Sequence, residues 1–292
     1  MARYSRRDFV KTTLAAGALA TTGTLPLLAA GAKATDTVTL GKSGVQVTRL
    51  AFGTGSNNGA VQRNLGQDQF SALVRHAYDR GIRFFETAES YPEMHRMLGI
   101  ALRGIPRDSY RLMSKVTTDS GDPGQRFDNL RRLANTDYFD IMLLHIQQGE
   151  DWPESSKRWQ DGILQAQEKK IILSRGASVH GLPALRQVPA NKWLQVAMIR
   201  MNHKGTKMDS DSNFWESTGD VSEVVSHVHK ARAAGMGVVS MKLVGEGVFN
   251  HEDRQKAMRF AFQNAGVDSV TVGYKSPAEV DEAIDNLNAA LA

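Results

Sequence analysis

The stretch Ile82-Arg83-Phe84-Phe85-Glu86 is a short apolar segment that ends on a carboxylate. Two similar segments further along the chain end on Lys115 and on His145. The three end residues stand 29 and 30 positions apart, which is about one strand-helix-strand unit. Parallel strands of a barrel bring their carboxyl ends to one mouth, where active sites are built. The spacing therefore predicts that these three side chains meet at one site with the phenol of Tyr91, which follows Glu86 by five residues.

The chain on both sides of this stretch repeats the alternation of strand and helix. Strands are expected at 49–53, 82–86, 110–115, 139–145, 171–178, 193–199, 236–241 and 269–273. Helices are expected at 67–80, 93–103, 124–135, 153–169, 181–187, 220–234, 252–265 and 277–290. Eight such pairs in about 250 residues predict an α/β fold, a closed (β/α)8 TIM barrel. A β-hairpin is expected before the first barrel strand, over residues 38–47.

An open, doubly wound sheet is the main alternative to a closed barrel. That fold carries a glycine-rich turn, G-x-G-x-x-G, after its first strand. In this chain Gly53-Thr54-Gly55 is followed by Ser-Asn-Asn, so the glycine-rich turn is absent. The barrel is therefore the preferred interpretation.

One connection between the expected elements is unusually long. Residues 202–220 show no clear period and contain Phe214-Trp215. A long loop in a compact domain is usually a lid or a binding loop. A disordered surface excursion is the alternative.

Residues 1–34 have the pattern of an export signal. The stretch Ser5-Arg6-Arg7-Asp8-Phe9-Val10-Lys11 is basic and holds a twin arginine, and a mildly apolar run over 12–30 follows it. A small-x-small cleavage site, Ala32-Lys33-Ala34, ends the segment. The paired arginines indicate the twin-arginine export machinery and a periplasmic location. We therefore expect a signal peptide over 1–34, a barrel domain over 35–292 and no stable membrane span after cleavage, with an uncleaved membrane anchor as the alternative.

The basic character of the chain comes largely from this signal. The chain has 36 basic and 31 acidic residues, a net charge of +5. The first 34 residues carry five of the basic and one of the acidic side chains, so the remainder has a net charge of +1. No basic patch with interleaved aromatic residues occurs, and no nucleic-acid partner is expected.

Neither cysteine nor histidine points to a metal site. Cysteine is absent, which excludes disulfides, thiolate metal sites and cysteine-ligated iron–sulfur clusters. His227 and His229 fall on an expected helix, where residues two apart point in different directions. No metal ion is expected.

The segment around the first quoted strand resembles a family signature. Residues 81–91, Gly-Ile-Arg-Phe-Phe-Glu-Thr-Ala-Glu-Ser-Tyr, are similar to the aldo/keto reductase pattern G-x-x-x-[FI]-D-T-A-x-x-Y. Ser114-Lys115 and Leu143-Leu144-His145 resemble the lysine and histidine strand ends of that family, and 270–277 resembles its last strand and nucleotide loop. The resemblance covers nearly all of the chain after the signal. It implies an oxidoreductase that reduces a small aldehyde or ketone with NADPH or NADH.

The resemblance assigns a role to each of the four polar residues. Tyr91 is expected to be the general acid, although free tyrosine, with a pKa near 10, is a weak one. We expect the Lys115 ammonium to lower that pKa and Glu86 to anchor the ammonium. His145 is expected to donate a hydrogen bond to the carbonyl oxygen of the substrate. Glu86 departs from the family pattern, which has the shorter Asp.

The positions that resemble the family's cofactor site match it less well. The candidate cofactor-binding residues are Ser178, His180, Asn202, Met241, Lys242, Lys275 and Ser276. Val179 and Met198 stand where the family has hydrogen-bonding side chains. Glu279 stands where the family has an arginine that contacts the 2′-phosphate of NADPH, so the preference between NADPH and NADH is open.

Two functions remain open from the sequence. The four polar residues favour an exported carbonyl reductase. The altered cofactor positions favour a catalytically weak or inactive periplasmic barrel that binds a ligand or a partner.

Overall fold

Eight parallel strands close into a barrel in the computed structural model, which describes residues 31–212 and 218–292. The strands follow one another around the barrel in chain order, with β10 pairing with both β3 and β9. Their bounds are β3 (Leu50–Gly53), β4 (Phe84–Glu86), β5 (Arg111–Val116), β6 (Phe139–Gln147), β7 (Ile172–Val179), β8 (Val196–Arg200), β9 (Gly237–Met241) and β10 (Ser269–Gly273). The predicted (β/α)8 barrel is confirmed.

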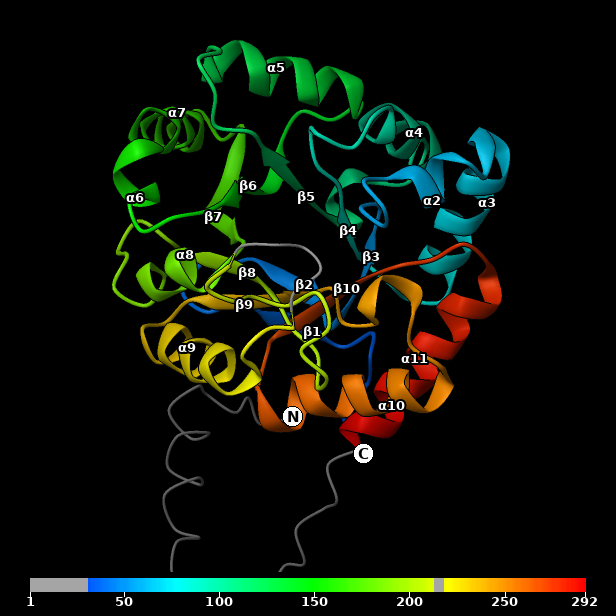
Figure 1. The fold of residues 1–292 in the computed structure, drawn as a ribbon. Helices are drawn as coiled ribbons and strands as arrows, with labels where there is room; N and C mark the ends of the chain where they lie inside the picture. Colours follow the sequence, from blue (N-terminus) through cyan, green and yellow to red (C-terminus); the bar gives the residue numbers. More distant parts are fainter. Residues whose placement is uncertain (1–30, 213–217) are drawn as a thin grey trace, which may run out of the picture. The chain divides into compact units, whose positions relative to one another are not determined.

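Helices connect the strands and surround them (Figure 1). The longer ones are α3 (Gly66–Asp79), α4 (Met94–Ala101), α5 (Pro123–Leu133), α7 (Lys157–Glu168), α9 (Val221–Ala233), α10 (His251–Arg259) and α11 (Pro277–Leu291). The shorter ones are α2 (Ala60–Arg63), η1 (Arg107–Ser109), α6 (Trp152–Ser155), α8 (Leu182–Gln187), η2 (Gly245–Gly247) and η3 (Phe260–Asn264). Local signals set several ends: the Ser276 hydroxyl caps α11 by accepting from the Glu279 N–H, and Pro277 is its first residue.

Two of the predicted helices differ from the structure. The helix expected over 153–169 is divided into α6 and α7 at Ser156, whose hydroxyl donates to the Trp152 carbonyl oxygen over 2.6 Å. The buried Trp152 indole donates to the Ala184 carbonyl oxygen over 3.1 Å, and this contact fixes α6 against α8. The helix expected over 252–265 ends as α10 and continues as the wider turn η3. The break at Ser156 involves contacts that helix periodicity does not reveal.

The expected hairpin is present as β1 (Thr37–Thr39) and β2 (Gln46–Thr48), and it closes one end of the barrel. Leu40, Val45 and Val47 pack in the same buried cluster as the side chains inside the barrel. Leu40 lies so close to Gly237, at the start of β9, that a Cβ there would come within 2.5 Å of the Leu40 Cβ. The amino ends of the strands are therefore covered, and the opposite mouth is left for a site.

Part of the long connection 202–220 is firmly packed. Thr206 and Thr218 form an antiparallel bridge, and Met208 and Asp209 are fully buried. Asp209 accepts from Arg200 of β8 and, over 2.7 Å, from the Gly181 N–H. The described part of this connection is thus an anchored loop, while Phe214-Trp215 lies outside the described residues.

The expected signal over 1–34 falls mainly in residues 1–30, outside the described part of the chain. Within residues 31–212 and 218–292, no helix is both long and apolar enough to cross a membrane.

Candidate active site

Three strand ends bring Glu86, Lys115 and His145 to one mouth of the barrel, and the loop after β4 adds Tyr91. Lys115 donates to Glu86 through a short ion pair and to the Tyr91 hydroxyl oxygen over 3.2 Å. The same ammonium donates to the Thr87 carbonyl oxygen over 3.2 Å and lies 4.7 Å from the centre of the Tyr91 ring. The side chains of Lys115 and Glu86 are only 1% and 3% exposed, so the charge pair lies out of water.

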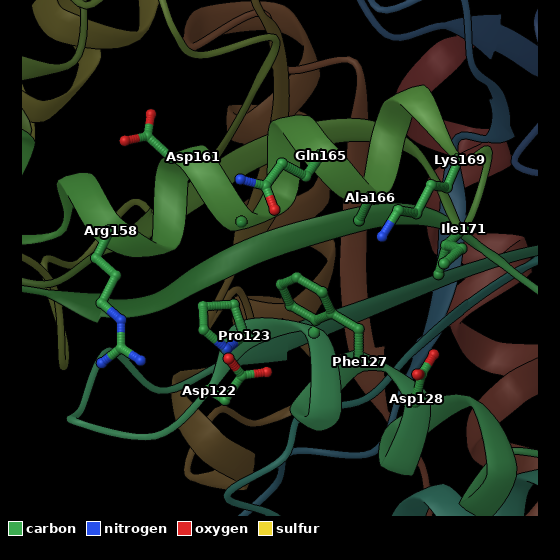
Figure 2. Close-up of a pocket in the computed structure, with 12 residues that line it drawn as sticks. Asp122, Pro123, Phe127, Asp128, Arg158, Asp161, Gln165, Ala166, Lys169 and Ile171 are labelled. Carbon is green, nitrogen blue, oxygen red and sulfur yellow. The ribbon is translucent and has the colours of Figure 1, made fainter.

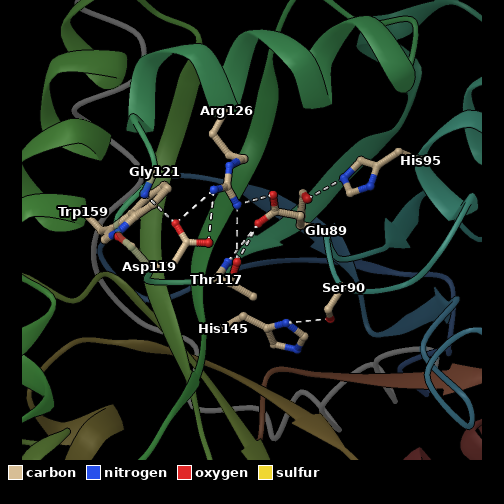
Figure 3. A network of polar contacts seen from close by, with 10 residues as sticks. Glu89, Ser90, His95, Thr117, Asp119, Gly121, Arg126, His145 and Trp159 are labelled. Carbon is tan, nitrogen blue, oxygen red and sulfur yellow. Dashed lines mark hydrogen bonds and ion pairs between the residues drawn. The ribbon is translucent and has the colours of Figure 1, made fainter.

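His145 lies beside Tyr91 with its ring nearly perpendicular to the phenol. The two ring centres are 5.6 Å apart. The Nδ1 atom of His145 is 3.1 Å from the Ser90 hydroxyl oxygen, a contact drawn in Figure 3. Burial lowers the pKa of His145 well below its usual value, and Lys115 and Lys242 add to this, so the ring is neutral near pH 7. When Ser90 donates to Nδ1, the other ring nitrogen carries the proton and can donate to a substrate.

The electrostatics of Tyr91 differ from the sequence argument. Burial raises the pKa of the Tyr91 phenol, and the carboxylate of Glu246 raises it further. The pKa of Tyr91 in the free protein is therefore raised overall, and not lowered towards neutrality as the sequence argument expected. Burial, followed by Lys242, lowers the pKa of Lys115, so Glu86 is the group that favours its charged form. The free protein thus holds Tyr91 protonated, as a proton donor must be.

A cavity of about 60 Å³ opens beside Tyr91, and Met198, Met241 and Lys242 are among its lining residues. A second cavity of about 410 Å³ adjoins it and reaches the start of α11. The two cavities share the residues Ser56, Val244, Glu246, Val272 and Gly273. They form adjoining spaces that lead from Glu86 and Tyr91 to the last barrel strand, while Lys115 and His145 line neither of them.

The sequence of the barrel matches a family model. The model described as "Aldo/keto reductase family" covers residues 49–258. The chain belongs to the aldo/keto reductase family. A model of the twin-arginine translocation signal sequence matches residues 3–23. The family and the export signal expected from the sequence are both confirmed.

The aldo/keto reductases that resemble this chain in sequence are distant from it. A "Probable aldo-keto reductase 1" from Glycine max is 24% identical over 228 residues, 73% of this chain and 60% of that protein. An "Aldo-keto reductase AFTS1" from Alternaria alternata is 26% identical over 207 residues, 56% of each chain. The chain therefore spans less than two thirds of the length of these two relatives.

Solved aldo/keto reductase structures share the fold. A putative aldo-keto reductase from Pseudomonas aeruginosa has a TM-score of 0.71 at 20% identity, over 88% of this chain and 96% of that one. An aldo-keto reductase from Klebsiella pneumoniae in complex with NADPH has a TM-score of 0.64 at 17% identity, over 88% and 90%. At these identities the likeness concerns the fold alone.

Three of the seven candidate cofactor residues line the cavities of this aldo/keto reductase. Met241 and Lys242 line the cavity beside Tyr91, and Lys275 lines the adjoining one. Ser276 lines neither, and its hydroxyl caps α11. Lys275 is paired with Glu279. Its Nζ atom lies 3.5 Å from one carboxylate oxygen, and its backbone N–H donates to the other carboxylate oxygen over 2.8 Å.

The remaining candidates lie at the ends of β7 and β8 and line neither cavity. Ser178 accepts from the Ile146 N–H over 3.1 Å, and His180 is buried. Burial lowers the pKa of His180 well below its usual value, with Arg200 adding to the effect. Asn202 donates to the Thr206 and Lys242 carbonyl oxygens over 2.7 and 3.3 Å, and its oxygen accepts two backbone N–H groups. Its amide therefore shapes the loop in this structure.

Sequence reasoning missed two residues at the mouth, Glu246 and Lys207. Glu246 lines both cavities and forms ion pairs with Lys242 and with Lys207, the latter at 3.1 Å. The sequence signal is Gly245-Glu246-Gly247, which indicates a turn but does not show where the carboxylate lies.

Sequence reasoning also missed a network that joins the loops after β4 and β5 (Figure 3). Glu89 accepts from the Thr117 N–H and hydroxyl over 3.1 and 2.9 Å, and it pairs with Arg126. Arg126 also pairs with Asp119 at 2.9 Å. Because Glu89 directly precedes Ser90 and Tyr91, this network holds the loop that carries them.

A larger hollow lies away from these residues, between α5 and α7 (Figure 2). Its volume is about 540 Å³, and Phe127, Arg158 and Lys169 are among its lining residues. None of the four polar residues lines it, so we do not assign it to the site.

The described residues hold no group of three or more His, Asp or Glu placed to bind a metal ion. His227 contacts the Glu223 carbonyl oxygen at 2.9 Å, and His229 contacts that of Asn264 at 3.1 Å. Both rings are thus engaged with the backbone.

Proposed function

We propose that this protein reduces an aldehyde or ketone to an alcohol with a nicotinamide dinucleotide. The observation that carries the proposal is the 3.2 Å contact between the Lys115 ammonium and the Tyr91 phenol, beside His145 and an open cavity. The hydride in this reaction comes from the reduced nicotinamide. The Tyr91 hydroxyl supplies the proton to the substrate oxygen, and the resulting phenolate lies next to an ammonium that stabilises it. The neutral His145 ring donates to the same oxygen and orients it.

The lining of the two cavities suits a dinucleotide. The flexible, polarisable side chain of Met241 offers an apolar contact for a ring, although it does not stack as tyrosine does. Lys242 offers a cation in the cavity beside Tyr91, and the larger cavity has room for a nucleoside. The absence of Ser178, His180 and Asn202 from the lining points to weak recognition of the nicotinamide amide.

The larger cavity favours NADH over NADPH. Lys275 is paired with Glu279, and Arg254 is held by both oxygens of Glu282, at 2.8 and 3.0 Å. A 2′-phosphate would have to compete with these carboxylates for the cations, whereas a ribose hydroxyl can donate to a carboxylate. We therefore propose NADH as the preferred cofactor.

Calorimetric titration with NADH and NADPH tests the proposal. We expect both to bind, NADH more tightly, and we expect carbonyl reduction that disappears in Tyr91→Phe. Absence of binding for both dinucleotides would contradict the proposal.

We propose that the enzyme acts in the periplasm of a bacterium after export by the twin-arginine machinery. The machinery exports folded proteins, so a dinucleotide bound in the cytoplasm can be carried across. Mass spectrometry of protein purified from the periplasm should detect bound nucleotide. Recovery of the protein only from the cytoplasm would contradict this location.

A second function, a ligand-binding barrel without turnover, is favoured by one observation. The cavity beside Tyr91 has a volume of only about 60 Å³, which is small for a nicotinamide and a substrate together. Carbonyl reduction that depends on Tyr91 would rule this function out.

A further inference from the structure

Two lysines from separate loops meet on one carboxylate at the mouth of the barrel. Lys242 follows β9, whereas Lys207 lies in the connection between β8 and α9. Lys207 donates to one oxygen of Glu246 over 3.1 Å, and Lys242 pairs with the other oxygen. The side chain of Lys207 is 25% exposed, that of Lys242 is 15% exposed and that of Glu246 is 20% exposed. Partial burial makes the attraction between these charges stronger than at an open surface.

The carboxylate stands where the two cavities adjoin. Glu246 lines both the cavity beside Tyr91 and the larger one that reaches Lys275. Its backbone has a φ of 56°, a left-handed conformation that a residue with a Cβ rarely adopts. It lies between Gly245 and Gly247, whose φ angles of 59° and 92° are also positive. An uncommon turn therefore presents this carboxylate.

A dinucleotide with its nicotinamide beside Tyr91 and its adenosine in the larger cavity must pass this junction with its pyrophosphate. Two lysines at one point provide six N–H donors and two positive charges, which match the charge of a pyrophosphate. In the free protein each of the two ammonium groups donates to the Glu246 carboxylate.

We propose that Glu246 occupies the place of the cofactor pyrophosphate in the free protein, and that Lys207 and Lys242 bind the pyrophosphate once Glu246 moves out. The proposal rests on the proposed function, since it assigns the ligand of the two lysines. It also gives the long connection after β8 a purpose, because that loop places Lys207, which lines neither cavity itself, on the carboxylate that lines both. Binding of the dinucleotide is weakened by the ion pairs that it must first break.

Calorimetric titration of Glu246→Gln separates displacement from a purely structural ion pair. We expect the variant to bind NADH, and inorganic pyrophosphate as a probe of the two lysines alone, about tenfold more tightly than the wild type. Glu252→Gln is the matched control: it removes the same charge from an exposed residue of α10 that pairs with Lys256, and it should leave both affinities unchanged. A structural ion pair would give a lower melting temperature and no gain in affinity, which would overturn the proposal.

Lys207→Gln provides a second variant whose effect does not depend on the folding of Glu246→Gln. In the wild-type background it should weaken NADH binding, and in the Glu246→Gln background it should abolish the gain. Unchanged NADH affinity in Lys207→Gln would overturn the proposal.

If Glu246→Gln binds pyrophosphate through Lys207 while no variant binds a dinucleotide, the proposed function fails and only the two-lysine anion site stands. If NADH binds the wild type and Glu246→Gln equally, the function stands and the displacement fails.

Discussion

Gly53 on β3 leaves the space in which Glu86 on β4 places its second carboxylate oxygen. A Cβ added to Gly53 would lie 3.1 Å from the Glu86 Oε2 atom and 2.6 Å from the Thr271 Cγ2 atom. The family pattern has the shorter Asp at position 86, so the longer side chain here needs this space. The glycine and the glutamate thus act as a pair that keeps the carboxylate on Lys115.

Gly53→Ala should lower stability and reduce activity. The added methyl group meets neighbours on both sides, and such overpacking costs about 1–3 kcal/mol. Urea denaturation measures the loss, and Gly53→Ala combined with Glu86→Asp should recover part of it. Gly124→Ala, where a Cβ approaches only the Asp122 side chain at 3.3 Å, is the control. Equal stability of Gly53→Ala and the wild type would contradict this account.

Tyr91→Phe should lower kcat by about two to four orders of magnitude, because general acid catalysis contributes roughly that much. The affinity for the dinucleotide should change little. Steady-state kinetics and calorimetry measure the two effects. Tyr78→Phe removes a hydroxyl that bonds to Ser109, outside the residues lining the cavities, and should keep full activity. Retention of kcat in Tyr91→Phe would remove this residue from the mechanism.

Lys115→Met should destabilise the protein by about 3–5 kcal/mol, because it leaves the Glu86 carboxylate buried without its cation. The double variant Lys115→Met/Glu86→Gln should regain most of this stability, since no buried charge remains. It should stay inactive, because Tyr91 has lost the ammonium. Chemical denaturation together with an activity assay measures both quantities, and an active double variant would contradict the role of Lys115.

The free energy of unfolding should fall as the pH drops from about 6.5 towards 4. Burial lowers the pKa of His95 from 6.5 to about 4, so the unfolded chain takes up this proton before the folded one. The contribution of His95 to the free energy of unfolding is therefore fully present above pH 6.5 and is lost progressively down to pH 4. The buried His145 and His180, whose pKa values are also lowered, act in the same direction. His95→Gln should flatten this dependence in urea denaturation at pH 7 and pH 5. Ser114→Ala removes only the hydrogen-bond partner of His95, so the free energy of unfolding should depend on pH as it does in the wild type. An unchanged pH dependence in His95→Gln would contradict the assignment of this effect to His95.

Glu279→Gln should improve NADPH binding relative to NADH by roughly tenfold. The substitution removes a negative charge beside Lys275, which leaves that ammonium available to a 2′-phosphate. The ratio of the two dissociation constants, measured by calorimetry, is the test. Glu252→Gln again serves as the control, and a ratio equal to that of the wild type would show that Glu279 does not set the preference.

Local sequence was enough to predict the barrel and the meeting of four residues. Regular spacing of strand ends fixes where Glu86, Lys115 and His145 emerge, because parallel strands of a barrel point the same way. The break between α6 and α7 could not be predicted in the same way, since it depends on Trp152 reaching the Ala184 carbonyl oxygen on another element. The cofactor candidates Ser178 and Asn202 were placed by family resemblance, and their hydrogen bonds within the protein became visible only in the fold.

The sequence by itself determined the alternation of strands and helices, the export signal and the set of polar residues at the mouth of the barrel. Periodicity and strand direction are local properties, and they carry this information along the chain. Only the tertiary structure decided that Lys207 meets Glu246, 39 residues later, and that Gly53 makes room for Glu86. Such contacts depend on how loops and neighbouring strands approach in space, which no spacing in the sequence encodes.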